Sequence, residues 1–178
     1  MKNILLALAL TIPFISVSYA KEAPEQIVET YLKEVNTNGF TNLSSQFHPD
    51  ELKKLKEAFV TFFEIAEDPA VIESFMGKKY SMKEVKKMSD SEFASKILKS
   101  VNALIDQDQI EFTRSEVIGS IAEKDNIHVL VRQYVKFEGG ELSAKDIVTL
   151  KPYGGSYKVM FSDTLDAMVQ GLKAGATD

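Results

Sequence analysis

The alternation of apolar and polar residues is clearest in residues 127–151, IHVLVRQYVKFEGGELSAKDIVTLK. Apolar residues recur there with a period of two on both sides of Gly139-Gly140, and glycine tolerates the positive φ that two-residue hairpin turns require. If these two glycines form the turn, Phe137 faces Leu142, and the apolar residues of both strands share one face. The pattern therefore predicts a β-hairpin with one apolar face.

The same register places two polar residues, Gln133 and Asp146, opposite each other on the apolar face. A carboxylate that is removed from water loses its hydration, which raises its pKa. Asp146 is therefore the leading candidate for a functional group, either as a general base or as the anchor for a polar group of a ligand. A structural hydrogen-bonded pair with Gln133, or a bulge that turns Asp146 outward, is the alternative.

Residues 24–105 show the spacing of amphipathic helices instead. Pro24 and Pro49 suit the first position of a helix, and Gly39 suits the end of one. Ser81 and Ser89 each begin a Ser-x-x-Glu capping box. The predicted helices run from Pro24 to Gly39, from Pro49 to Ala66, around Val71 to Met76, from Ser81 to Met88 and from Ser89 to Ile105, with a weaker helical turn at 40–47.

From Gln109 the period changes to two. Residues 110–123 form a predicted strand whose phase switches between Phe112 and Val117, which indicates a bulge near residues 114–116. After the hairpin, residues 152–155 form a predicted loop that returns the chain into a last strand. That strand brings Phe161 beside Asp146, and a short helix from Asp163 closes the chain.

Helices followed by a four-stranded antiparallel meander predict an α+β fold, with the N-terminal helices packed on a bent, cone-like sheet. A length of 178 residues with 44% hydrophobic residues suits one domain with a proper core. We therefore predict a single domain over residues 21–178.

This order of elements resembles the nuclear transport factor two-like (cystatin-like cone) superfamily. The stretches FHPDELKKLKEAF and MSDSEF are similar to segments of uncharacterised exported bacterial members. The resemblance implies a bent sheet that wraps around helices and often leaves a pocket. It also implies a superfamily that includes ketosteroid isomerase, which uses carboxylates inside the cone, and many members with no known chemistry. No motif matches residue by residue, so we assign no catalytic residue.

Residues 1–20, MKNILLALALTIPFISVSYA, carry Lys2, an apolar run and small residues at Ser18 and Ala20. This pattern predicts a secretory signal peptide whose apolar core is too short to span a membrane. We therefore expect a periplasmic or secreted protein. The chain has no cysteine, which excludes disulfides and thiol catalysis.

The chain carries a net charge of −5, and removal of Lys2 with the leader makes it more negative. This balance disfavours nucleic acid and anionic membranes as partners, and nothing after residue 20 is apolar enough for a membrane span. His48 lies in His-Pro-Asp-Glu, but these neighbours lack metal-ligand spacing, and a helix start explains them better. No nucleophile elbow, phosphate loop or dinucleotide motif occurs, so we expect no metal and no cofactor.

An aromatic stretch on the predicted 49–66 helix is the second candidate for ligand contact, with an ordinary core as the alternative. The expected ligand-binding residues are Asp146, Gln133, Phe59, Phe62, Phe63 and Phe161. The favoured function is an exported, non-catalytic binding module for a small apolar molecule or a protein partner. The alternatives are an isomerase- or hydrolase-like enzyme that uses Asp146 and a periplasmic lipid carrier. An apolar patch of Leu130, Tyr134, Ile147 and Met160 on the opposite sheet face also makes a homodimer plausible.

Overall fold

The structure is a computed structural model that describes residues 22–104 and 110–162 together with residues 167 and 171. The predicted leader and all of the predicted C-terminal helix except residues 167 and 171 lie outside the described residues. The helices are α1 (Pro24–Asn38), α2 (Pro49–Ala66), α3 (Pro69–Met76), α4 (Met82–Lys87) and α5 (Asp90–Leu104), with a 3-10 turn η1 (Leu43–Ser45). The strands are β1 (Ile110–Glu123), β2 (Asn126–Phe137), β3 (Gly140–Tyr153) and β4 (Ser156–Val159). They form one antiparallel sheet in the order β1-β2-β3-β4.

The helix starts and ends lie close to where the sequence places them. Helices α1, α2 and α3 each have proline in the first turn, where the missing N–H costs no helical hydrogen bond. The Ser81 hydroxyl accepts from the Glu84 amide at 3.3 Å, and the Glu84 carboxylate accepts from the Ser81 amide at 2.8 Å. At the start of α2, Nδ1 of His48 accepts from the Asp50 amide at 3.2 Å. The predicted helix-start role of His48 is therefore confirmed.

The predicted register of the β2–β3 hairpin is wrong by two residues. Phe137 pairs with Gly140, so Glu138 and Gly139 form the turn, and Asp146 pairs with Val131 instead of Gln133. Only Gly139 has a positive φ in this turn, so a pair of glycines does not identify the loop residues by itself. Because side chains alternate with a period of two, a shift of two residues leaves every side chain on its predicted face.

Two other details of the sheet also differ from the prediction. Leu150 pairs with Val159, because the β3–β4 turn uses only Gly154 and Gly155 and not the four residues expected. The register of β1 shifts at Thr113, next to the predicted bulge, and again at Ile118, where none was expected. These shifts raise the local twist of β1.

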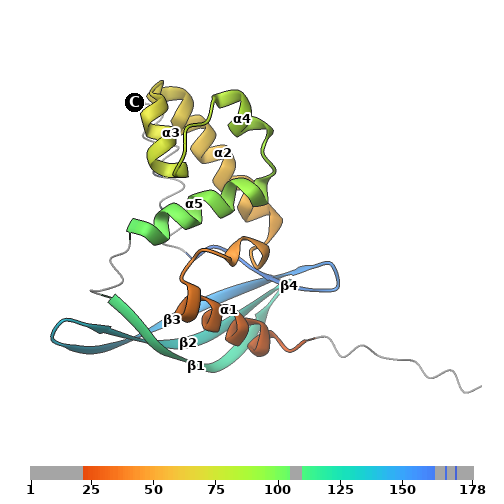
Figure 1. The fold of residues 1–178 in the computed structure, drawn as a ribbon. Coiled ribbons are helices and arrows are strands. Elements are labelled where there is room, and N and C mark those ends of the chain that lie inside the picture. The colour runs from red at the N-terminus through yellow and green to blue at the C-terminus, as the bar shows by residue number, and fades with distance from the viewer. Residues whose placement is uncertain (1–21, 105–109, 163–166, 168–170, 172–178) are drawn as a thin grey trace, which may run out of the picture.

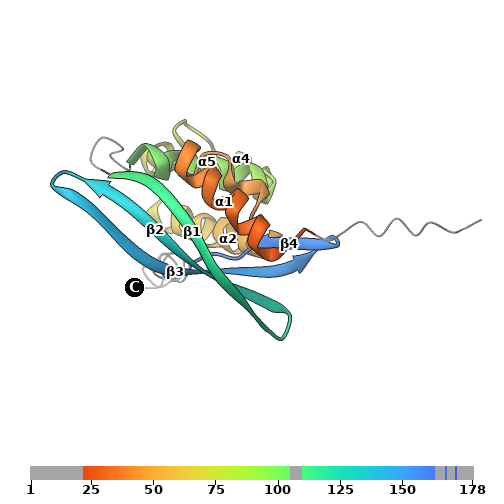
Figure 2. The same ribbon diagram turned by 90° about the horizontal axis from the view of Figure 1, so that it is seen from below.

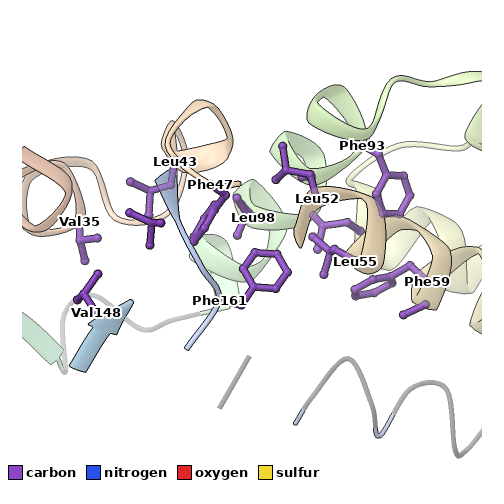
Figure 3. Packing of buried hydrophobic residues seen from close by; sticks show 14 of the residues in the cluster. Val35, Leu43, Phe47, Leu52, Leu55, Phe59, Phe93, Leu98, Val148 and Phe161 are labelled. Carbon is purple, nitrogen blue, oxygen red and sulfur yellow. The ribbon is translucent and has the colours of Figure 1, made fainter. Parts of the chain in front are cut away.

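The elements form a sheet, a helix lying on it and a further helical layer (Figure 1). We call the sheet face that α1 covers the inner face and the opposite one the outer face. Val35 of α1 and Val148 of β3 point toward each other on the inner face (Figure 3). From there the core continues through Phe47 and Phe161, whose ring centroids lie 5.0 Å apart, into the helical layer. The predicted α+β fold of helices on a four-stranded antiparallel meander is confirmed.

The inner face is open at the end that carries the β2–β3 turn. Val129 and Val131 are fully buried, whereas Phe137 and Leu142 on the same face are 39% and 64% exposed. The β2–β3 turn projects beyond α1 (Figure 2). A boundary between covered and open sheet therefore crosses the middle of β2 and β3. None of the helices in the described ranges has the length and apolarity of a bilayer span.

Candidate functional site

A pocket of about 150 Å³ lies at this boundary, between α1, the inner face of the sheet and the segment after β4. The polar groups of its lining come from α1, β2, β3 and the segment after β4. The described lining residues are Tyr31, Val35, Phe40, Phe112, Gln133, Asp146, Ile147, Val148, Val159, Met160 and Ser162. Strand alternation places Gln133, Asp146 and Val148 on the inner face, and the packing of α1 on that face brings Tyr31 and Val35 to them.

Gln133 and Asp146 both line the pocket, although they do not pair directly. Gln133 pairs with Ala144, and Asp146 pairs with Val131, which lies two residues along the same face of β2. The two polar side chains are therefore diagonal neighbours on the inner face. Gln133 and Asp146 are therefore neighbours, as predicted, although the predicted register was wrong.

The predicted burial of Asp146 is wrong, because its side chain is exposed. Strand β4 pairs with β3 only from Leu150 to Tyr153, so Asp146 lies on a stretch of β3 that β4 does not flank. Its Oδ1 accepts the backbone N–H of Ile147 at 2.8 Å. Water reaches the carboxylate, and the desolvated general base of the enzyme alternative is not present.

Tyr31 is a pocket residue that the sequence did not single out. Burial raises the pKa of Tyr31 to about 12, and the negative charge of Asp146 adds to the effect. The phenol therefore stays neutral at physiological pH and can both donate and accept hydrogen bonds. The signal available in the sequence is a hydroxyl-bearing residue on the apolar stripe of the first helix, at helical spacing from Val28 and Val35.

The raised pKa of Tyr31 predicts a loss of stability at alkaline pH. Folded Tyr31 holds its proton more tightly than an unfolded tyrosine, so its contribution is fully present below pH 10.0 and disappears as the pH rises to about 12. Across that window we expect a loss of about 2 to 3 kcal/mol. Urea unfolding at a series of alkaline pH values measures it, and Tyr31→Phe should flatten the slope.

The control for this measurement is Tyr153→Phe, since Tyr153 is an exposed tyrosine. Its removal should leave the alkaline slope unchanged. Asp146→Asn should reduce the slope in part, because burial of Tyr31 remains. Equal slopes in wild type and Tyr31→Phe would contradict the assignment.

A second polar group missed in the sequence lies between α1 and β1. Nδ2 of Asn36 donates to Oγ of Ser115 at 3.2 Å, and Oδ1 of Asn36 is buried without a hydrogen-bond partner. Ser115 pairs with Gln133 across β1 and β2, so this row of polar groups leads to the pocket. An unsatisfied buried acceptor is costly in a protein interior. The row therefore favours a hydrogen-bond donor from a ligand or water.

Three of the predicted ligand-contact residues lie elsewhere. The Phe59 ring packs against Phe63, Phe75 and Phe93 at centroid distances of 5.7, 5.3 and 6.1 Å. Phe62 packs against Phe63 and Phe75. Phe59, Phe62 and Phe63 thus belong to the helical layer and do not line the pocket, because the apolar face of α2 turns toward α3 and α5.

Phe161 is brought near Asp146, as the sequence indicates. Both residues line a more open hollow of about 600 Å³ at β3, together with His128, Lys145, Ile147, Thr149 and Ser162. Phe161 also packs against Phe47, which anchors the segment after β4. Asp146 therefore lies between this hollow and the pocket under α1.

Metal-ligand geometry does not occur in the parts of the chain that the structure describes: no three His, Asp or Glu side chains gather there in a group able to hold an ion. On the outer face, Leu130 pairs with Ile147, and Ile121 and Ile147 are exposed. A homodimer through that face stays a prediction.

No protein-family model and no curated protein matches this chain. Among solved structures, the chain is similar to a crystal structure from Campylobacter jejuni that is provisionally described as an NTF2-like transpeptidase. Sequence identity is 12%, the TM-score is 0.41, and the match covers 78% of this chain and 98% of that one. The likeness concerns the fold alone. Helices packed on a four-stranded antiparallel sheet are consistent with the NTF2-like cone fold that the element order indicates.

Proposed function

We propose that the protein is an exported, non-catalytic binding module that takes a small, mainly apolar molecule into the pocket under α1. The observation that carries the proposal is the lining of this pocket. Valine, phenylalanine, isoleucine and methionine make up seven of the eleven described lining residues, and the other four, Tyr31, Gln133, Asp146 and Ser162, supply hydrogen-bonding groups. Small-molecule sites in proteins typically combine an apolar lining with a few polar groups that orient the ligand. The export step rests on the leader sequence in residues 1–20.

The size of the pocket limits the ligand. Drug-sized molecules occupy sites of about 300 to 1,000 Å³, whereas this pocket measures about 150 Å³. An apolar protein cavity of about 150 Å³ accepts a benzene-sized molecule. A ligand with one ring therefore fits, and an acyl chain does not, which argues against the lipid-carrier alternative at this site.

A binding function also agrees better with Asp146 than an enzymatic one does. The isomerase- or hydrolase-like alternative needs a carboxylate that an apolar environment turns into a stronger base. Asp146 is exposed, and a backbone amide already donates to one of its oxygens. A protein partner remains the second candidate, because Phe137 and Leu142 extend the apolar inner face beyond α1.

The proposal predicts that toluene binds between α1 and the sheet. We expect increasing toluene to shift the backbone amide NMR signals of pocket-lining residues such as Val35 and Val148. Gln133→Trp should weaken this binding at least tenfold, because the indole fills the pocket while tryptophan remains a good strand residue.

The matched control is Lys136→Trp, which adds the same side chain to the exposed outer face of the same strand. Toluene binding should remain in this variant. If toluene shifted no pocket residue in the wild-type protein, or if both tryptophan variants bound toluene equally, the pocket would not be the ligand site.

A further inference from the structure

We infer that the ligand of this pocket is a small organic cation, an amine with one ring or a similarly compact apolar body. This inference rests on the proposed function and adds the charge of the ligand to it. It is carried by the way the sheet separates charges between its two faces, by the position of the Asp146 carboxylate and by the rings around it.

The strands place one charged residue on the inner face over the whole described length of β1, β2 and β3. Apart from Asp146, no inner-face position of β2 and no residue that pairs with one in β1 or β3 is charged. These positions hold larger apolar residues, glycine, alanine, serine or glutamine. The basic residues of β2 and β3 alternate onto the outer face: Arg132, Lys136, Lys145 and Lys151. The inner face therefore carries a negative charge, whereas His128 and Lys145 line the neighbouring hollow beside Asp146 and not this pocket.

The Asp146 carboxylate is oriented and remains able to bind. Its Oδ1 accepts the Ile147 amide at 2.8 Å, which restricts the rotation of the side chain. The hydrogen bond also gives the Ile147 amide a partner on a stretch of β3 that β4 does not flank. It therefore has a structural role as well. The bond is made by Oδ1, and the exposed position leaves the carboxylate reachable from solvent.

The negative charge of Asp146 acts inside the pocket as well as at its rim. Its field contributes to the raised pKa of Tyr31, which sits on the opposite wall in α1. A cation placed between these two groups gains from the same field, whereas an anion is repelled by it. Among the described lining residues, none carries a positive charge.

Aromatic rings add a second attraction for a cation. Tyr31, Phe40 and Phe112 all line the pocket, and the faces of such rings attract ammonium groups. Gln133 in the lining also offers an amide oxygen. An ammonium group has three donors and no acceptor, so it can bind to this oxygen and to the Asp146 carboxylate.

Three probes with the same ring test the inference: benzylamine, benzyl alcohol and benzoate. Each is titrated into the full chain, and the shifts of the pocket amide signals give its dissociation constant. We expect benzylamine to bind about three- to tenfold more tightly than benzyl alcohol, because its ammonium group gains one exposed ion pair and ring contacts. Benzoate should bind more weakly than benzyl alcohol.

Asp146→Asn should bring benzylamine to the affinity of benzyl alcohol for the same variant. The asparagine side chain keeps an oxygen that can accept from the Ile147 amide, so the strand geometry should persist. The matched control is Asp125→Asn, which removes one exposed charge in the β1–β2 turn, outside the pocket lining. This control should keep the preference for benzylamine.

The outcomes separate the two proposals. If none of the three probes nor toluene shifted the pocket signals, the binding function itself would be wrong. Binding of benzyl alcohol as tight as that of benzylamine to the wild-type protein would overturn the cation preference alone. Should Asp146→Asn not fold, the preference is tested in the wild-type protein by added salt, which should weaken benzylamine and leave benzyl alcohol unchanged. A preference insensitive to salt would then count against the ion pair.

Discussion

Replacement of Phe59 by alanine is expected to lower the free energy of unfolding by about 3 to 5 kcal/mol. Phe59 is 1% exposed and contacts three aromatic rings in the helical layer. Alanine leaves a cavity that the ring pairs around it cannot close without losing their own geometry. Urea unfolding followed by circular dichroism measures the change as a lower midpoint with an unchanged slope.

The control on the same helix is Ile65→Ala. Ile65 is 50% exposed, and a substitution at such a surface position changes stability by about 0.5 kcal/mol or less. The pair of variants also tests the alternative in which Phe59 lines a ligand cavity. A loss below about 1 kcal/mol for Phe59→Ala would favour that cavity and contradict the packing described here.

Replacement of Gly39 by alanine is expected to cost about 2 to 4 kcal/mol. Gly39 follows α1 with φ 59° and ψ −139°, a backbone conformation that side chains disfavour. A Cβ at this position would lie 1.8 Å from Oδ1 of Asn102. Asn102 must then rotate away and lose its hydrogen bond to the Phe40 amide, which is 3.1 Å long. Thermal and urea unfolding both measure the loss.

Gly77→Ala is the matched control for Gly39→Ala. Gly77 also has a positive φ, of 68°, but its nearest neighbour to an added Cβ is Oγ of Ser100 at 3.8 Å. Gly77→Ala should therefore cost only the strain of the left-handed backbone conformation, which is about 1 to 2 kcal/mol. Asn102→Ala in the Gly39→Ala background removes the clash and should leave the backbone strain. Equal losses for Gly39→Ala and Gly77→Ala would show that the contact with Asn102 contributes nothing.

These two variants differ in how far the sequence anticipates them. Gly39 is readable as a helix end, because glycine after an amphipathic stripe is a local signal. The proximity of Asn102 is not readable, since 63 residues of chain separate the two positions. The sequence also predicts that Phe59 belongs to the apolar stripe of a helix. It does not show whether that stripe packs against other helices or lines a ligand site, because those elements are distant in the chain.

The sheet shows the same division. The period of two assigned the faces of β2 and β3 correctly, so Gln133, Asp146 and Val148 share the inner face. The pairing itself was misplaced by two residues, because Glu138-Gly139 and Gly139-Gly140 are both acceptable turns by composition. An even shift is invisible to the hydrophobic pattern, and only the hydrogen-bonded register resolves it.

The amino-acid sequence alone determined the α+β class, the approximate starts and ends of the helices and the faces on which the residues of β2 and β3 lie. These properties follow from interactions within a few residues of chain, namely caps, stripes and alternation. The tertiary structure decided that Asp146 is exposed, that Tyr31 lines the same pocket, and that Phe59, Phe62 and Phe63 belong to the helical layer. Those properties depend on where β4 stops and where α1 lies across the sheet. Both are set by the packing of segments that are far apart in the chain, which periodicity does not record.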